Sequence, residues 1–391
     1  MGYAKVFVGV LFLFVTLATT SAIKCATNTT TTNSTCRSLI DYVPVNNTVL
    51  SAVQSLFQIK RFHDLLGAND FPTSTLPNQT LQALHRIRIP FTCRCENGTG
   101  VSDRAPVYTV KKDDGLYNIA FFTFSNLVKY EEIAKVNGIP DPNNITVGQE
   151  LWIPLPCSCD EVEGAKVVHY GHVVEAGSSV DQIATVYGTT PAILLNLNEM
   201  ANASQLQAGQ VFDVPLKACN SSVNSSSLDY PLLVANGTYV YTANDCVNCK
   251  CSSGNNYILQ CETSGLKPSK TWSTCPAAQC NGKSSLYLLG NVTTASTTCN
   301  QTTCAYSGFT NESIFTTLAT ESTCPAGGPT GSPTSSPGSD ASKNGLQGLS
   351  PAAAPSGIPT SDAFKIGLQG LRWNFHFFSI QLIFLCFHLS Q

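Results

Sequence analysis

The sequence contains two pairs of adjacent carboxylates, Asp113–Asp114 and Glu131–Glu132, which are its first candidates for acid–base chemistry. A glycoside hydrolase needs two carboxylates that face each other across a sugar-binding cleft. Neighbouring side chains diverge, so neither pair has that arrangement. We interpret both pairs as helix-capping and solvated surface groups.

Histidine is the next candidate for catalysis. His169 and His172 lie close together in the sequence, whereas His63 and His85 are isolated. A triad needs a serine or cysteine nucleophile beside the histidine, and no such pattern accompanies these residues. We therefore predict no catalytic residue and no enzymatic activity.

Cysteine use is heavy, with 17 residues, of which only Cys386 lies outside the segment between Cys25 and Cys324. The other sixteen form an even set, which predicts eight disulfides in an oxidising compartment. The Cys246-x-x-Cys249-x-Cys251 spacing also resembles a zinc knuckle, but no histidine-rich cluster lies nearby. Disulfides are the preferred interpretation, so we predict no metal and no cofactor.

The N-terminal end predicts secretion. Lys5 precedes an apolar run and the small residues Thr19-Thr20-Ser21-Ala22, so residues 1–22 are interpreted as a signal peptide. A transmembrane anchor is the alternative, but the apolar run is short for a bilayer.

The C-terminal end predicts a GPI anchor. Small residues around Ser361 are followed by a polar spacer and the uncharged segment Trp373–Leu389. Ser361 is the predicted attachment site, and Gly357 and Ser339 are alternatives. A tail-anchored transmembrane protein is the competing interpretation.

Glycosylation signals fit the outer face of the plasma membrane. The chain has thirteen Asn-X-Ser/Thr sequons, at Asn28, Asn33, Asn46, Asn78, Asn97, Asn144, Asn202, Asn220, Asn224, Asn236, Asn291, Asn300 and Asn311.

Charged residues make up only 12% of the chain and the net charge is −3. No basic field is available to hold nucleic acid, so nucleic-acid binding is excluded.

Two segments of the chain repeat. Val110, Ile119 and Ala120 match residues 64 positions later, whereas Gly148-Gln149 and Ile153-Pro154 match residues 61 positions later. The first copy therefore carries three additional residues. Each copy predicts the order strand, helix, helix, strand, with Asp113-Asp114 or Ser178-Ser179 capping the first helix and Pro191 in the first turn of a second helix.

The repeated pattern resembles the LysM module. The Gly-Gln-x-x-x-(Ile/Val)-Pro ending, the Ile-Ala of the first helix and the Asn that closes the second helix carry this resemblance. A weaker copy keeps Leu65-Leu-Gly-Ala-Asn69 and Ile87-Arg-Ile89-Pro90 but has Leu84-His85 where Gly-Gln is expected. A LysM fold is therefore expected there, with a doubtful ligand groove.

Three such modules, Cys-x-Cys pairs between them and a GPI tail resemble the plant LysM GPI-anchored proteins. The resemblance implies an α+β fold of three small βααβ LysM modules stapled by disulfides Cys25–Cys95, Cys36–Cys159 and Cys93–Cys157, followed by a cysteine-rich, β-rich domain. The expected segments are a signal peptide (1–22), a degenerate LysM (23–95), a middle LysM (96–159), a third LysM (160–219), a cysteine-rich domain (220–324), a Pro/Ser/Gly stalk (325–361) and a GPI-signal propeptide (362–391).

The family implies that N-acetylglucosamine chains bind between two loops of a module. Backbone groups and apolar surface would suit an uncharged N-acetyl sugar. In the middle module the implied binding residues are Lys112, Asp113, Asp114, Gly115, Leu116, Tyr117, Gly138, Ile139, Pro140, Asp141, Pro142, Asn143 and Ile145. The competing interpretation is that Leu116 and Ile139 simply pack the core.

Charge distinguishes two possible ligands. Peptidoglycan carries peptide carboxylates, which a basic groove would favour. Residues 167–216 contain no Lys or Arg, and acidic residues offset Lys111 and Lys112 in the middle module. This charge pattern favours neutral chitin over anionic peptidoglycan. The resemblance implies a receptor for chitin oligosaccharides that acts with a transmembrane LysM receptor kinase in immune perception of fungi. A ligand-bridged homodimer is a further expectation, and peptidoglycan is the alternative ligand.

Overall fold

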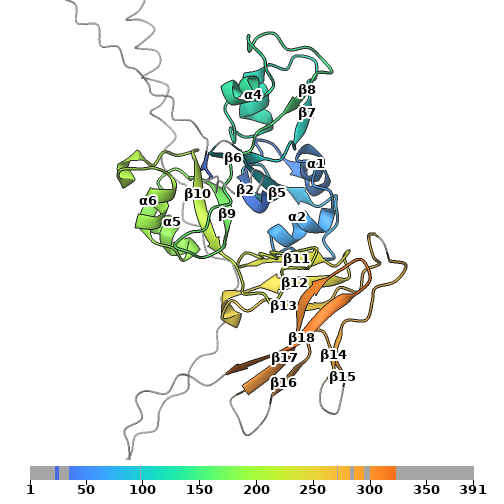
Figure 1. Ribbon diagram of the computed structural model, residues 1–391. Helices are drawn as coiled ribbons and strands as arrows, with labels where there is room; N and C mark the ends of the chain where they lie inside the picture. Colours follow the sequence, from blue (N-terminus) through green and yellow to red (C-terminus); the bar gives the residue numbers. More distant parts are fainter. Residues whose placement is uncertain are drawn as a thin grey trace, which may run out of the picture. The chain divides into compact units, whose positions relative to one another are not determined.

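The computed structural model describes residues 23–25, 35–96, 98–270, 272–281, 286–294 and 300–322 (Figure 1). The expected signal peptide, stalk, GPI segment and Ser361 lie outside these residues, as do the sequons at Asn28, Asn33 and Asn97. Among the helices of the described ranges, none is both long enough and apolar enough to cross a membrane.

The third repeat folds as strand, helix, helix, strand. Ser179 caps the first helix by accepting the backbone N–H of Gln182, and Pro191 lies in the first turn of the second. Both sequence predictions for these helices are therefore confirmed. The elements are β9 (Val167–Val173), α5 (Val180–Tyr187), α6 (Pro191–Leu197) and β10 (Val211–Lys217), with a 3-10 turn at Ala203–Gln205.

The middle repeat has the same order of elements: β7 (Val107–Thr109), α3 (Leu116–Asn118), a π-helical turn (Ile119–Thr123), α4 (Tyr130–Val136) and β8 (Glu150–Trp152). The N-cap of α3 is Gly115, and it makes no side-chain capping bond. The prediction that Asp113-Asp114 caps this helix is therefore wrong, because Asp114 instead binds groups of the preceding strand and turn.

The N-terminal unit repeats the architecture with a different closing corner. Its elements are β2 (Thr35–Tyr42), β3 (Thr48–Val49), α1 (Leu50–Leu56), α2 (Phe62–Ala68), β4 (Thr80–Leu81) and β5 (Ile87–Glu96). Ile40 and Ile89 lie opposite each other in the antiparallel β2–β5 pair, and both are fully buried. The alternating apolar residues of Ile87-Arg-Ile89 thus form the inner face of this strand.

The N-terminal and third units share one sheet. Its strand order is β1-β6-β5-β2-β9-β10, where β1 is Ile23–Lys24 and β6 is Thr99–Ser102. β2 joins β9 in parallel, with Leu39 opposite Tyr170. The middle unit keeps its own β7–β8 hairpin and shares a hydrophobic core with the N-terminal unit, which includes edge-to-face contacts of Phe57 with Tyr42 and Phe124.

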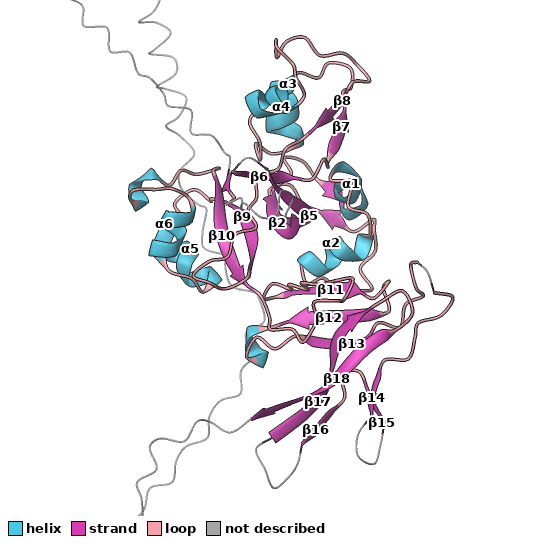
Figure 2. Cartoon of the chain, viewed as in Figure 1, coloured by secondary structure: helices cyan, strands magenta, loops and turns pink. Residues whose placement is uncertain are grey.

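The regular elements described after the third unit are strands, apart from one short 3-10 turn at Ser253–Asn255 (Figure 2). They make a sheet of β11 (Thr238–Thr242), β12 (Val247–Cys251) and β13 (Gln260–Thr263), a hairpin of β14 (Gln279–Asn281) and β15 (Leu286–Leu288), and a sheet of β16 (Val292–Thr294), β17 (Asn300–Phe309) and β18 (Ile314–Ser322).

Disulfides cross-link these units. Cys25 pairs with Cys95, Cys36 with Cys159 and Cys93 with Cys157, which is the connectivity that the resemblance implies. Four further bridges join Cys219–Cys251, Cys246–Cys275, Cys249–Cys261 and Cys280–Cys304. Cys299 and Cys324 lie outside the described residues.

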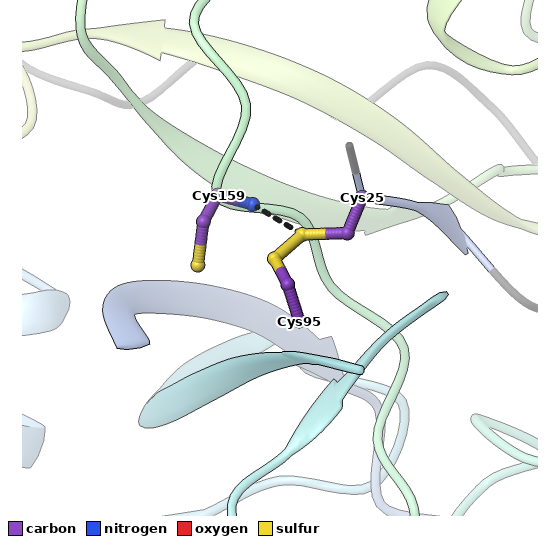
Figure 3. Close-up of side chains that lie close together, drawn as sticks. All are labelled: Cys25, Cys95 and Cys159. Atoms are coloured by element: carbon purple, nitrogen blue, oxygen red, sulfur yellow. Dashed lines mark hydrogen bonds between the residues drawn. A yellow bond between two sulfur atoms is a disulfide. The ribbon is translucent and has the colours of Figure 1, made fainter. Parts of the chain in front are cut away.

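The bridges of the N-terminal region lie close together. Figure 3 shows Cys25 bonded to Cys95 beside Cys159, whose backbone N–H donates to Cys25 Sγ at 3.2 Å. Such a sulfur cluster has the spacing of a metal site. Each of these sulfurs is already in a disulfide, so none offers the thiolate that a metal ion requires.

Candidate functional site

Asp114 holds the first predicted loop, 112–117. Its Oδ2 accepts hydrogen bonds from the Tyr108 hydroxyl at 2.9 Å and from the Lys111 backbone N–H at 2.7 Å. Burial raises the pKa of Tyr108, and the Asp114 carboxylate raises it further, to about 12. The phenol therefore stays protonated at neutral pH and continues to donate, so Asp114 shapes the loop and its carboxylate is already engaged.

The two predicted loop glycines are open to approach. Apart from the adjoining residues in the chain, no heavy atom of a described residue lies within 4 Å of the point where a Cβ on Gly115 or Gly138 would stand, and Gly138 has a φ of +64°. Leu116 is different, because α3 begins there and its side chain is only 1% exposed. Leu116 is a core residue and offers a sugar no side-chain surface, which corrects its place among the predicted binding residues and agrees with the competing interpretation.

The second predicted loop, 138–145, is held together by the side chain of Asp141. Asp141 Oδ1 accepts hydrogen bonds from the backbone N–H of Asn143 at 3.0 Å and from its Nδ2 at 3.1 Å. Ile139 and Ile145 are half-buried against the core that contains Leu116. Both loops are therefore anchored to one core, and their polar edges remain at the surface.

Most of the thirteen predicted residues present some surface. Five are half-buried (Asp114, Gly115, Ile139, Pro142 and Ile145) and seven are exposed (Lys112, Asp113, Tyr117, Gly138, Pro140, Asp141 and Asn143). Several backbone N–H groups donate no hydrogen bond to any described residue, namely those of Lys112, Asp113, Gly115 and Ile145. These N–H groups can donate to the carbonyl oxygen of an acetamido group.

An aromatic surface adjoins the first loop and consists of Tyr117, Phe121 and Phe122, which are 57%, 41% and 53% exposed. The Tyr117 and Phe121 rings stack with centroids 5.6 Å apart and planes 7° apart, and Phe122 meets Phe121 edge-on. Sequence reasoning missed Phe121 and Phe122. The four-residue spacing of Tyr117 and Phe121, which places two residues on one helix face, could have revealed them.

In each unit an asparagine side chain forms hydrogen bonds with the closing strand. Asn137 Nδ2 donates to the carbonyl oxygens of Ile133 and Trp152, both at 2.8 Å, and its Oδ1 accepts from the Trp152 N–H at 2.9 Å. Asn69 and Asn198 make the same three bonds in the other units. The repeated asparagine is therefore structural and joins the second helix to the closing strand.

The Gly-Gln corner separates the N-terminal unit from the others. Gly148 and Gly209 have φ values of +86° and +80°, and the Gly148 N–H donates to Val110 O at 2.8 Å. Leu84 occupies this corner in the N-terminal unit, with a φ of +63° and an N–H that donates to Pro44 O at 2.8 Å. The unit thus keeps the fold without the glycine that the corner favours.

The buried histidines have structural partners. His169 Nδ1 lies 2.9 Å from Asp213 Oδ2, and its Nε2 lies 2.8 Å from the carbonyl oxygen of Asp160. Burial lowers the pKa of His169, but these two acceptors raise it by a larger amount, so the net direction is upward. His172 Nδ1 lies 3.1 Å from Asp41, which is fully buried.

Sequons lie beside two of the predicted grooves. Asn144 belongs to the second loop of the middle unit and Asn202 to the equivalent loop of the third, and both are exposed. Asn202 Oδ1 accepts from the Ser204 N–H, which leaves its Nδ2 available for a glycan. Six other sequon asparagines are exposed (Asn46, Asn78, Asn220, Asn224, Asn291 and Asn311), and Asn236 is half-buried.

The predicted groove is separate from three cavities of the described residues. Cavities of about 670, 470 and 500 Å³ lie elsewhere in the chain, and none of the thirteen predicted residues lines them.

Family models match both clear repeats. Residues 106–155 match the NFP LysM2 domain, and residues 172–215 match the LysM domain. Chitin elicitor receptor kinase 1 of Physcomitrium patens is 24% identical over 189 residues, which cover 48% of this chain and 28% of the kinase. LysM-containing receptor kinases are thus related to this chain.

Two relatives align over most of their length. LysM domain-containing GPI-anchored protein 2 of Arabidopsis thaliana is 46% identical over 311 residues, covering 79% of this chain and 85% of that protein. The chitin elicitor-binding protein of Oryza sativa subsp. japonica is 44% identical over 302 residues, covering 75% and 82%. The chain therefore belongs to the plant LysM domain-containing GPI-anchored proteins.

Proposed function

We propose that this protein is a non-catalytic receptor for chitin oligosaccharides, held on the outer face of the plasma membrane by a GPI anchor. The binding site is the surface between loops 112–117 and 138–145, extended by the aromatic surface. The observation that carries the proposal is the combination of loop N–H groups that donate to no described residue with the exposed Tyr117–Phe121 stack. The name of the chitin elicitor-binding protein supports the ligand class.

The chemistry of the ligand fits both parts of this surface. Backbone N–H groups of the loops donate to the acetamido carbonyl oxygens of N-acetylglucosamine residues. Apolar sugar ring faces and acetamido methyl groups pack on Tyr117 and Phe121. The loops are preformed, since Asp114 and Asp141 already hold them, and this lowers the entropy lost on binding.

The charge of the surface supports a neutral ligand over peptidoglycan. Lys112 is offset by the exposed Asp113 and Asp141, and Lys111 lies over the ring of Tyr108 at 5.5 Å. A peptide carboxylate would thus meet no net positive field.

Signalling requires a partner. We propose that a transmembrane LysM receptor kinase supplies the cytosolic part in immune perception of fungi, as the related kinase of Physcomitrium patens suggests by its name. A long chitin chain can also join two copies of this protein, because the second binding event is then intramolecular. Equal self-association with short and long oligomers would exclude such bridging.

Calorimetry with the glycosylated protein tests the ligand class. Chitin octamer and a disaccharide-tetrapeptide muropeptide are titrated separately, and the intact oligomer is verified afterwards by mass spectrometry. We expect saturable binding of the octamer, weak or absent binding of the muropeptide, and no shortening of the octamer. Muropeptide binding without octamer binding would show that the ligand is peptidoglycan and not chitin. A shortened octamer would show that the protein is a hydrolase and not a receptor.

A further inference from the structure

The cysteine-rich region contains a cavity between two sheets. The sheets are β11–β13 and β16–β18 (Figure 1), and the cavity has a volume of about 500 Å³. The proposed chitin site lies on a different unit and shares none of its lining residues with this cavity.

Polar side chains line the cavity from both sheets. Asn248 lies opposite Glu262 and Lys250 opposite Gln260 in the β12–β13 pair, and Gln301 and Thr303 line it from β17. The intervening β12 residues, Val247, Cys249 and Cys251, belong to the apolar core. Side chains alternate between the two faces of a strand, so Asn248 and Lys250 lie on the face opposite this core, where they line the cleft together with Gln260 and Glu262.

The side chain of Asn248, which lines this cleft, has an acceptor atom without a hydrogen-bond donor among the described residues. Its Oδ1 is buried and accepts no hydrogen bond from the part of the chain that the structure describes. A buried carbonyl without a donor is unfavourable, and native proteins pair nearly all such groups. A ligand that supplies a hydroxyl or amide donor at this point would satisfy it.

The charges of the cleft favour a neutral ligand. Lys250 Nζ is engaged by Asp70 at 2.8 and 3.1 Å, and Glu262 is the one carboxylate among the lining residues. An anion would meet that carboxylate. Amide groups and hydroxyls recognise a neutral, hydroxyl-rich molecule, and Ile258 and Val292 add apolar lining for the CH faces of a sugar ring.

The cleft is preorganised. Cys261 and Cys304 both line it, and they are tied by disulfides to Cys249 and Cys280. These bridges restrain β13 and β17, so little conformational entropy is lost when a ligand enters.

We propose that this cleft is a second carbohydrate-binding site, which takes a neutral saccharide through Asn248, Gln260, Gln301 and Thr303. Two sources can supply the same chemistry. One is a free oligosaccharide, and the other is the chain's own N-glycan on Asn220, an exposed sequon residue that lines the cleft.

Calorimetric titration of the full glycosylated protein tests the proposal, with chitotetraose and cellotetraose as probes. The tested variants are Asn248→Leu and Thr303→Val, and Thr263→Val is the matched control on the same sheet, outside the cleft. All are made in a Tyr117→Ala background that weakens the proposed chitin site, and their unfolding temperatures are compared. Asn220→Gln removes the local glycan, and hydrogen–deuterium exchange of β12 and β17 is measured with and without it.

We expect at least one probe to bind. Its affinity should be at least tenfold lower in Asn248→Leu and Thr303→Val and unchanged in Thr263→Val. Binding to the glycosylated protein identifies a free oligosaccharide as the source. Binding only after Asn220→Gln, with slower exchange of β12 and β17 when the glycan is present, identifies the internal glycan. Absence of probe binding to both forms with equal exchange, or equal probe affinity of all cleft variants, would overturn the proposal without affecting the chitin site.

Discussion

Leu84 illustrates how a single residue separates the N-terminal unit from its two relatives in the chain. Its φ of +63° lies in the region that glycine adopts at Gly148 and Gly209, and its side chain is 74% exposed. Its side chain therefore gains little by burial while the backbone carries the cost of the left-handed conformation.

Leu84→Gly should therefore raise the free energy of unfolding by about 0.5–1 kcal/mol. This is the left-handed cost of about 1–2 kcal/mol reduced by the larger entropy of glycine in the unfolded chain. Chemical denaturation measures the change. Leu76→Gly is the control, since Leu76 is 63% exposed and has no positive φ, and it should destabilise. A destabilised Leu84→Gly variant would contradict the account.

His169 makes stability depend on pH. Its two ring nitrogens face Asp213 and a backbone carbonyl, and its pKa in the folded protein is raised. Its contribution to stability is therefore complete below the unfolded-state pKa of about 6.5 and is lost as pH rises through the folded-state pKa. The free energy of unfolding should fall over that range in the wild type and fall less in His169→Gln, with the exposed His85→Gln as control. Identical pH profiles for wild type and His169→Gln would refute this role.

At the scale of elements, the packing of α2 on β11 depends on Gly67. A Cβ added at Gly67 would lie 2.1 Å from the carbonyl oxygen of Tyr239, well inside any tolerated contact. The same helix end is tied to this region by the Tyr239 hydroxyl, which donates to Phe71 O at 2.8 Å. The N-terminal unit thus packs against the cysteine-rich region through its second helix.

Gly67→Ala should lower the free energy of unfolding by about 1–3 kcal/mol, because one of the two backbones must move. Gly254→Ala is the matched control, since its Cβ would meet nothing closer than 3.4 Å and its φ is ordinary. Denaturation of both variants measures the difference. Equal stability of the two variants would show that α2 and β11 do not approach this closely.

The repeat offsets correctly predicted that the middle repeat is longer than the third. Offsets of 64 and 61 placed three additional residues inside the middle repeat, and residues 124–129 between its helices outnumber residues 188–190 in the third. The N-cap of α3 could not be read in the same way, because Asp114 binds Tyr108 instead of the helix terminus.

At the scale of the whole molecule, the shared sheet could not be predicted from local patterns. The parallel pairing of Leu39 with Tyr170 joins segments that no repeat or turn signal connects. The cleft between the sheets of the cysteine-rich region has the same origin, since Asn248 and Gln301 are brought together only by tertiary structure. The two loops and Tyr117 were named through the family resemblance, whereas the inward position of Leu116 depended on where α3 begins.

The central claim is that chitin binds at the middle unit. Calorimetric titration of chitin octamer against Tyr117→Ala and Val186→Ala tests it most directly, because Val186 is a 74% exposed apolar residue on α5 of the third unit. Tyr117→Ala removes one stacked aromatic ring, worth about 1.4 kcal/mol or a tenfold change in Kd. It should therefore bind chitin octamer about tenfold more weakly, whereas Val186→Ala should bind it with unchanged affinity. An unchanged Tyr117→Ala variant together with a weakened Val186→Ala variant would move the site to the third unit and contradict the claim.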